Sequence, residues 1–358
     1  MRPTGLLWPL ALVGCALLFV SFRQAPAPAE KSSAESWVER DQTRISTVDC
    51  GRGETLTRAL ERPATSLQIS FRGTCNEDLL IERGRVTLTG LDASAVIEGS
   101  VTVSGAGNVV LESFSVRNSA GNCIVALRSS SAELRNISVA QCGANGIIAA
   151  GSSLIFLRGT VSAAACAGAG LAATNSSNTT LAAGAAVTLT GNGIGWLIQV
   201  SGSSTMNRTA TLQAAANLGP GIVLASGGNL SLNGINTLNL TGNGGPGAVL
   251  TDSATLVAVQ DSGVTVNLSG NGGAGLQAER TSVVDLLGNS TISSDNAGPG
   301  LDIDDGTLRL GDLTATDNGG SDVSLAFGSR ATFAGGSYNV GTVTCEPTVL
   351  VRGALGCT

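Results

Sequence analysis

Histidine is absent from this sequence of 358 residues, and lysine occurs once, at Lys31. Without histidine, the sequence has no imidazole for a zinc site or for histidine-dependent acid–base catalysis. The chain has 20 basic and 26 acidic residues, a net charge of −6 and a pI near 4.8. Nucleic acids require clustered lysine and arginine, so we expect no nucleic-acid partner.

Aromatic residues make up only 3% of the sequence and charged residues 13%, whereas apolar residues make up 42% and glycine occurs 49 times. This balance excludes a highly charged disordered chain. The core must therefore consist mainly of small and β-branched side chains. The length fits two or three globular domains or one elongated repeat array.

The first 29 residues are typical of an export signal. Arg2 precedes an apolar run over 6–22, and small residues follow at Ala25, Ala27 and Ala29. The run is short for a spanning helix and contains a proline, which favours a signal that is cleaved after Ala29. Alternatively, Leu-Val-Gly-Cys ending at Cys15 is similar to a bacterial lipoprotein box. Lipidation of Cys15 would tether the protein to a membrane, although the apolar run continues beyond it.

The stretch from 24 to about 47 is rich in alanine, proline, serine and glutamate, which predicts a flexible tether over 30–47. We expect an ordered domain over 48–330 and a C-terminal tail over 331–358. The cysteines favour an oxidising compartment, so the protein is expected to be secreted, periplasmic or at the cell surface. Cys50 with Cys75, and Cys345 with Cys357, are the expected disulfides, and the tail is closed by the second. The pairing of Cys123, Cys142 and Cys166 stays open.

One short pattern recurs along the chain: NGGPGAVL at 243–250, NGGAGLQA at 271–278 and NAGPGLDI at 296–303. The glycine before the apolar pair marks each copy, at intervals of about 24 to 28 residues. The marker positions are Gly146, Gly170, Gly195, Gly221, Gly247, Gly275 and Gly300. Each interval holds three short strand-like runs separated by glycine, asparagine, serine and aspartate turns.

Three strands in each period of about 25 residues predict an all-β fold, a parallel β-helix. Stacked coils bring equivalent positions together, so each asparagine is expected to hydrogen-bond its counterparts and each glycine to adopt a turn conformation with positive φ. Alternation along the strands places Leu276, Ala278, Leu301 and Ile303 inside. A segment over Gly53–Arg62, with Leu56, Ala59 and Leu60 at helical spacing, predicts one short N-terminal helix.

The repeats from Asn108 to Leu325, together with TLTRAL, LQISFRGTC and VTLTG before them, resemble the right-handed parallel β-helix proteins of the pectate-lyase type found in bacteria. The resemblance implies that the N-terminal helix caps the cylinder. It implies no single activity, because this fold carries lyases, glycosidases, esterases, epimerases, tailspikes and adhesins.

Two other interpretations of the repeat are excluded. The run Gly242–Gly247 fits the letters of a dinucleotide-binding motif, but no βαβ unit follows, so we expect no nucleotide. The runs are also similar to a calcium-binding nonapeptide repeat. That repeat needs an aspartate after the third glycine, where Ala248 and Leu276 stand here.

Two features of the outward positions are candidates for function. The first is an apolar stripe of Ile148, Leu197, Val223 and Val249, which predicts a surface covered by a tail or a sister subunit, or a docking surface for a protein or polysaccharide. No aromatic lies on it to stack a sugar, because Trp196 should point inward.

The second candidate is an acidic cluster, Glu279, Asp302 and Asp304, with Asp305 and Arg280 nearby. Asp302 and Asp304 should project from one strand about 6.5–7 Å apart. They are the candidate catalytic acids of a glycosidase, and with Glu279 they could bind calcium, the one cofactor considered. A solvated charged turn that prevents end-to-end stacking is the simpler interpretation.

The resemblance also allows particular enzymes to be compared with the sequence. Lyases of this fold combine calcium carboxylates with an arginine or lysine base, for which Arg280 and Arg309 are the nearest candidates. Enzymes of this fold that use histidine with tyrosine do not fit, and Tyr338 stands alone. We therefore expect a non-catalytic scaffold or adhesion module at the surface or envelope. The alternative is a polysaccharide lyase or glycoside hydrolase that uses the acidic cluster.

Overall fold

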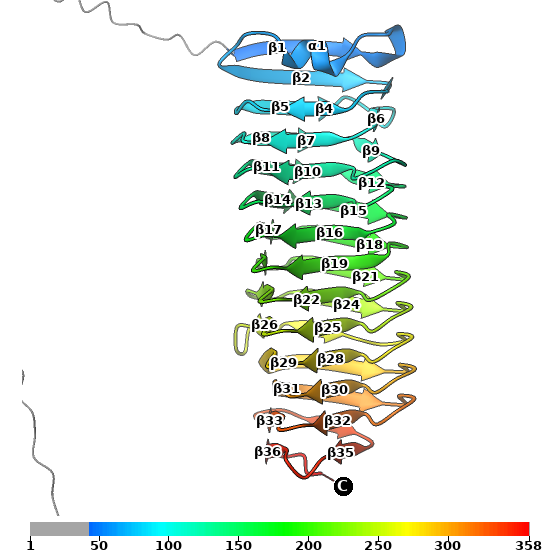
Figure 1. The fold of residues 1–358 in the computed structure, drawn as a ribbon, viewed down its shortest axis with the longest axis vertical. Helices are drawn as coiled ribbons and strands as arrows, with labels where there is room; N and C mark the ends of the chain where they lie inside the picture. The colour runs from blue at the N-terminus through cyan, green and yellow to red at the C-terminus, as the bar shows by residue number, and fades with distance from the viewer. Residues whose placement is uncertain (1–42, 358) are drawn as a thin grey trace, which may run out of the picture. The chain divides into compact units, whose positions relative to one another are not determined.

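The computed structural model of the protein describes residues 43–357, and Figure 1 shows them as a stack of parallel coils. The predicted right-handed parallel β-helix is confirmed, and it has about 13 turns. Most coils contribute one strand to each of three faces, which we call the front, second and third faces. Cys15, the signal segment and most of the expected tether lie outside the described residues.

The front face is a sheet of twelve parallel strands. Its strands are β4 (Leu79–Ile81), β7 (Val101–Ser104), β10 (Ile124–Leu127), β13 (Ile147–Ala149), β16 (Ala169–Thr174), β19 (Ile194–Gln199), β22 (Ile222–Ala225), β25 (Ala248–Thr251), β28 (Leu276–Glu279), β30 (Leu301–Asp304), β32 (Val323–Ala326) and β35 (Val343–Cys345).

The other two faces are joined into one sheet by the long strands β29 and β31, which bend from one face to the other. The second face consists of β1 (Thr43–Asp49), β2 (Ser66–Arg72), β5 (Val86–Gly90), β8 (Val109–Glu112), β11 (Ser131–Arg135), β14 (Leu154–Arg158), β17 (Asn178–Leu181), β20 (Ser203–Met206), β23 (Asn229–Leu232), β26 (Thr255–Ala258), β29 (Val283–Ser294), β31 (Thr307–Thr316), β33 (Arg330–Phe333) and β36 (Leu350–Gly353). The third face consists of β3 (Thr74–Cys75), β6 (Val96–Glu98), β9 (Ser115–Arg117), β12 (Ser138–Ala140), β15 (Thr160–Ala164), β18 (Ala186–Thr190), β21 (Thr211–Ala215), β24 (Thr237–Thr241), β27 (Thr265–Asn267), the ends of β29 and β31, and β34 (Tyr338–Val340).

The interior follows the predicted alternation. Leu276 and Leu301 pair across adjacent coils, as do Ala278 and Ile303, and all four side chains are buried. Trp196 is also fully buried, as expected. Each fully buried leucine or isoleucine side chain stabilises the fold by about 1.5–3 kcal/mol. The repeated pairs therefore stabilise the core coil by coil.

The repeated asparagines form a continuous ladder inside the turn that leads into the front face. The side-chain amide of Asn243 donates to Oδ1 of Asn271 at 3.0 Å, and Asn271 donates to Asn296 in the same way. The same bond joins Asn192 to Asn217, Asn217 to Asn243 and Asn296 to Asn318. The predicted asparagine stacking is therefore confirmed, and it satisfies polar groups that would otherwise be buried without partners.

The prediction that the marker glycines are required for a positive φ is wrong. Gly242 and Gly270, which precede the ladder asparagines, do have positive φ, at 64° and 70°. The marker Gly275 does not, and glycine is needed there because a Cβ would lie 2.5 Å from the carbonyl oxygen of Gly300 in the next coil. Close stacking of the coils, and not turn conformation, therefore requires glycine at this position.

A short helix, α1 (Leu56–Leu60), lies at the N-terminal end of the stack (Figure 1). It is shorter than the predicted Gly53–Arg62, but Leu56, Ala59 and Leu60 are buried as its spacing indicated. The carboxylate of Glu77 accepts hydrogen bonds from the backbone N–H groups of Leu56 and Thr57, at 2.7 and 2.9 Å. This cap satisfies the free donors of the first turn. No helix within residues 43–357 is long and apolar enough to cross a membrane.

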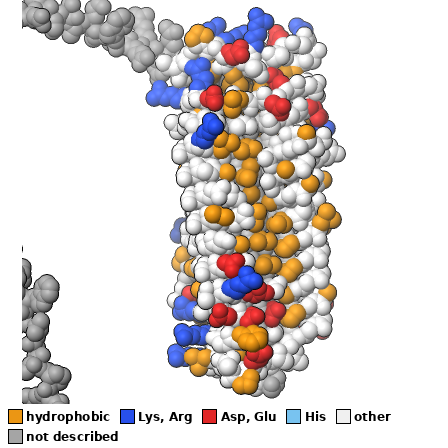
Figure 2. Space-filling view, viewed as in Figure 1, with side chains coloured by type: hydrophobic (Ala, Val, Ile, Leu, Met, Phe, Trp, Pro, Cys, Tyr) orange, Lys and Arg blue, Asp and Glu red, His pale blue; other side chains and the backbone are white. Residues whose placement is uncertain are grey.

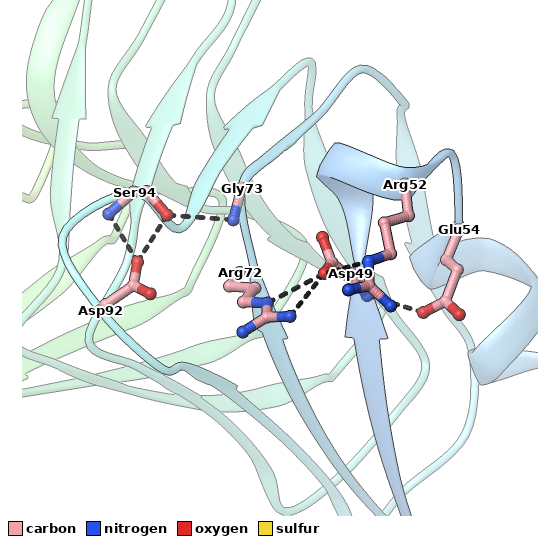
Figure 3. Close-up of polar contacts among 7 residues, drawn as sticks. All are labelled: Asp49, Arg52, Glu54, Arg72, Gly73, Asp92 and Ser94. Atoms are coloured by element: carbon pink, nitrogen blue, oxygen red, sulfur yellow. Dashed lines mark hydrogen bonds and ion pairs between the residues drawn. The ribbon is translucent and has the colours of Figure 1, made fainter.

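A polar network fixes the first coils (Figure 3). Asp49 accepts hydrogen bonds from both Nε and Nη2 of Arg72, at 3.0 and 2.7 Å, and lies 3.4 Å from Nε of Arg52. Its backbone N–H donates to Glu54. The hydrogen bonds from Arg72 are the main cause that holds the pKa of Asp49 below its usual range.

Both expected disulfides, Cys50–Cys75 and Cys345–Cys357, are present. A third joins Cys123 to Cys142, whose pairing the sequence left open, and Cys166 is a buried free thiol. All the cysteines of the described residues are thereby placed.

The solenoid is longer at both ends than the expected 48–330. Strand β1 begins at Thr43, inside the expected tether, and pairs with β2 over its whole length. The expected tail over 331–358 contributes β34, β35 and β36, which pair with the preceding coil. The tail therefore continues the β-helix rather than folding over the apolar stripe.

Candidate functional site

The front face carries both sets of candidate residues in the register that the sequence indicated. Backbone pairing connects Leu197 to Val223, Val223 to Val249, Val249 to Gln277, and Gln277 to Asp302. A parallel ladder two residues further along connects Glu279 to Asp304. The apolar stripe and the acidic group, by which we mean Glu279, Asp302 and Asp304, are thus parts of one surface.

The apolar stripe is outward-facing but only partly exposed. Ile148, Leu197, Val223 and Val249 are each half-buried, because neighbouring side chains in the stack cover one another. Ala172 interrupts the stripe between Ile148 and Leu197 and is buried beneath them. Figure 2 shows hydrophobic side chains running along the middle of this face, with charged ones gathered towards both of its ends.

The acidic group lies on the open surface of β28 and β30. Asp302 and Asp304 alternate with the buried Leu301 and Ile303, so both side chains point outward from one strand. All three carboxylates are half-buried, and Asp305 follows as an exposed residue at the end of the strand. Neighbouring coils are about 4.8 Å apart, which brings the Glu279 and Asp304 side chains side by side.

Asp304 has a pKa above its usual range. Partial burial is the largest cause, and the negative charges of Glu279, Asp302, Glu346 and Asp305 add to it in that order. Like charges that crowd a carboxyl group favour its protonated form. The acidic group is therefore a concentration of negative charge, and within residues 43–357 none of its three carboxylates forms an ion pair.

The two arginines considered as catalytic bases are engaged elsewhere. Arg280 forms an ion pair with Asp252 at 3.1 Å. Arg309 pairs with Asp285 at 2.6 Å, and both lie on the second face, so Arg309 does not belong to the site. Glu279 accepts a 2.6 Å hydrogen bond from the side-chain amide of Gln277 instead.

One residue of this surface was missed by sequence reasoning. Phe327 follows Ala326, which pairs with Asp304, and its side chain is 65% exposed. Its backbone N–H donates to a carboxylate oxygen of Glu346 at 3.2 Å. An exposed aromatic residue therefore directly follows β32, the strand that pairs with the acidic strand β30, although no aromatic lies on the apolar stripe. The alternation gives no signal for it, because a residue two positions after the buried Leu325 would be expected to point inward.

Two other groups of chemically active side chains do not form sites. Tyr338 packs edge-on against Phe333, and its hydroxyl group is buried without a hydrogen-bond partner. Burial raises the pKa of Tyr338. Cys50, Cys75 and Glu77 lie within 4.8 Å of one another, but the two sulfurs form a disulfide and Glu77 caps α1.

The acidic group offers two kinds of chemistry. Oxygen ligands from Glu279, Asp302 and Asp304 fit a hard cation such as calcium, and a cation would relieve the repulsion that raises the pKa of Asp304. Asp304, whose pKa is raised by partial burial and by the neighbouring carboxylates, also fits a general acid, with Asp302 as the second carboxylate of the pair.

The comparison with solved structures identifies the fold. The A-module of the mannuronan C-5 epimerase AlgE6 from Azotobacter vinelandii superimposes with a TM-score of 0.54 at 13% identity, covering 84% of this chain and 93% of that one. A variant of the periplasmic alginate epimerase AlgG gives a TM-score of 0.49 at 12% identity, over 87% of this chain and 84% of that one. No protein-family pattern and no curated protein matches the sequence. The likeness establishes a β-helix of the pectate-lyase type.

Proposed function

We propose that the protein is an exported, polysaccharide-active β-helix protein that contacts its glycan at the C-terminal end of the front face. The observation that carries this proposal is that the acidic group and Gln277 lie on adjacent strands of the front face, and that the exposed Phe327 directly follows the next strand. Carboxylates and amides hydrogen-bond sugar hydroxyl groups, and an aromatic ring stacks on the apolar face of a sugar.

Three further points support this proposal over a non-catalytic scaffold. An extended polymer matches a surface whose equivalent positions repeat about every 4.8 Å. The raised pKa of Asp304 marks a carboxyl group with altered chemistry, which a structural rod does not need. AlgE6, which shares the fold, is a mannuronan epimerase, so a β-helix of this size can serve a polysaccharide-modifying enzyme.

Export is the proposed localisation. Disulfides persist in oxidising compartments and are rare in the cytosol of most organisms, and the described residues contain three. The apolar N-terminal run supports the same conclusion from sequence.

The negative charge of the acidic group affects neutral and anionic polysaccharides differently. A neutral glycan can hydrogen-bond the carboxylates directly. A uronate polymer would be repelled by them unless calcium bridges its carboxylates to Glu279, Asp302 and Asp304. Hydrolysis of a neutral glycan, with Asp304 as acid and Asp302 as base, is the catalytic form of the proposal, because an inverting pair is separated by about 6.5–9.5 Å.

The test is retardation of the purified protein in native gels containing neutral glucans or uronate polymers, with calcium or chelator. Reducing ends and unsaturated products are measured in parallel. Asp302→Asn/Asp304→Asn and Phe327→Ala should each lose retardation. Glu98→Gln, which removes an exposed carboxylate from the third face, and Leu218→Ala, which removes an exposed apolar side chain, are the matched controls. Retardation that persists in both site variants would overturn the proposal.

A further inference from the structure

Several arginines on the surface of this solenoid pair with a carboxylate of an adjacent coil. Arg72 pairs with Asp49 at 2.7 Å, and Arg309 pairs with Asp285 at 2.6 Å, each across a single step of the stack. Arg117 lies 3.6 Å from Glu98 in the same arrangement. The register therefore places opposite charges at equivalent positions, which stabilises adjacent coils.

Two arginines in the last coils of the second face form no such pair among the described residues. Backbone pairing connects Arg309 to Thr332 and Thr332 to Arg352. In the adjacent ladder, Arg330 lies between Thr307 and Leu350. Arg330 and Arg352 are exposed, and within residues 43–357 no carboxylate lies within 4.0 Å of either guanidinium group. Two cations thus stand diagonally across neighbouring coils, and neither has a carboxylate partner in the described part of the chain.

These side chains surround a shallow cavity of about 160 Å³. It is lined by Thr307, Arg309, Arg330, Thr332, Leu350 and Arg352. A cavity of this size has room for one small anion with part of its hydration shell. The threonine hydroxyl groups add neutral hydrogen-bond donors between the guanidinium groups.

We propose that this cavity binds a phosphate- or sulfate-type oxyanion, either free or as an ester group on a larger molecule. Guanidinium groups offer paired N–H donors that match two oxygens of such an anion, and an anion there removes the repulsion among the arginines. The chain as a whole is negative, so a general attraction for polyanions does not account for this cluster. The site lies on the second face and is independent of the polysaccharide surface on the front face.

The first test is calorimetric titration of the full chain with inorganic phosphate and with sulfate, at ionic strength held constant with chloride. Wild-type protein should bind, and Arg330→Ala/Arg352→Ala should bind at least about tenfold more weakly. Arg330→Lys/Arg352→Lys keeps the charge but loses the paired donors, so its affinity should fall between the two. Both positions are exposed, and thermal unfolding checks that each variant is folded.

The matched control is Arg117→Ala/Arg158→Ala, which removes two exposed, carboxylate-paired arginines elsewhere on the solenoid. It should bind the anion as the wild type does. Retention of dextran sulfate but not of dextran, reversed by phosphate, would show that an ester on a polymer is also bound, whereas binding of phosphate alone would restrict the ligand to free anions. The proposal is overturned if neither anion binds, or if the Arg330/Arg352 variants bind as tightly as the control.

Discussion

The surroundings of Asp304 raise its pKa, whereas the surroundings of Asp49 lower its pKa. Asp304 is crowded by other acids, and its pKa is raised, mainly by partial burial. Asp49 accepts hydrogen bonds from Arg72, which lower its pKa. Since a pKa difference between folded and unfolded states makes stability depend on pH, the two residues predict opposite mutational effects.

Asp304→Asn should raise the midpoint of thermal unfolding at pH 7. With its folded pKa raised, Asp304 favours the folded state only when it is protonated, and that contribution is lost as the pH rises through the folded value. The asparagine variant avoids this loss. Near pH 3 the carboxyl group is largely protonated in both states, so wild type and variant should unfold alike. Calorimetric scans at the two pH values measure the difference, and an unchanged or lowered midpoint at pH 7 would contradict the account.

Asp49→Asn should have the reverse effect. The lowered pKa of Asp49 means that its carboxylate stabilises the folded state above the usual range of a free aspartate, and that this contribution disappears as the pH falls through the folded value. The variant should therefore be less stable than wild type at neutral pH and should converge with it in acid. Limited proteolysis at the N-terminal end, at pH 7 and pH 3, reports the difference locally, and equal cleavage at pH 7 would refute it.

At the scale of strands and turns, close stacking of the coils sets the tolerance for side chains. A Cβ on Gly275 would lie 2.5 Å from a carbonyl oxygen of the next coil and 2.1 Å from the hydroxyl oxygen of Ser293. A Cβ on Gly242 would meet nothing within 4 Å, but its φ of +64° disfavours alanine. The two glycines are required for different reasons.

Gly275→Ala should consequently cost more stability than Gly242→Ala. Crowding in a packed region costs about 1–3 kcal/mol, whereas a left-handed conformation costs alanine about 1–2 kcal/mol and leaves the contacts intact. Denaturant titration of both variants compares the free energies of unfolding. A larger loss for Gly242→Ala would show that turn conformation, and not stacking, controls the repeat.

The disulfide near the C-terminus stabilises the last strands of the solenoid. Cys345–Cys357 joins the last front strand to the end of the chain, across a separation of 12 residues. A loop of about that size is worth roughly 3 kcal/mol in the unfolded-chain account. Since each coil contacts only its neighbours, Cys357→Ser should loosen β35 and β36 and leave the central coils unchanged. Hydrogen exchange resolves the two regions, and protection lost throughout the solenoid would contradict this expectation.

Sequence spacing predicted the elements well wherever one pattern repeats. The marker glycines define the register, and that register alone places Val223, Val249, Gln277 and Asp302 on one ladder. It could not predict features at which the repeat changes. The residues after Leu325 lack the marker, so neither the continuing coils nor the exposed position of Phe327 after β32 could be inferred. The pairing of Cys123 with Cys142 depends on side-chain direction within a turn, which spacing alone does not specify.

For the molecule as a whole, the β-helix separates three chemically different surfaces. The front face has an apolar stripe leading to an acidic group, with an exposed aromatic directly after the next strand. The last coils of the second face carry arginines without carboxylate partners, and the third face contributes neither. A linear polymer can follow the front face without contacting the arginine cavity, so the two proposed sites predict independent binding.

The most direct test of the account is carboxylate footprinting by mass spectrometry in the presence of each polysaccharide. A carbodiimide couples an amine to accessible carboxyl groups, and a bound glycan shields them. We predict that one class of glycan reduces labelling of Glu279, Asp302 and Asp304 while Asp92 and Glu98, far from the front-face site in sequence, are labelled as before. Equal labelling of all five carboxylates with every neutral and uronate polymer, with and without calcium, would contradict the assignment of the front face as a polysaccharide surface.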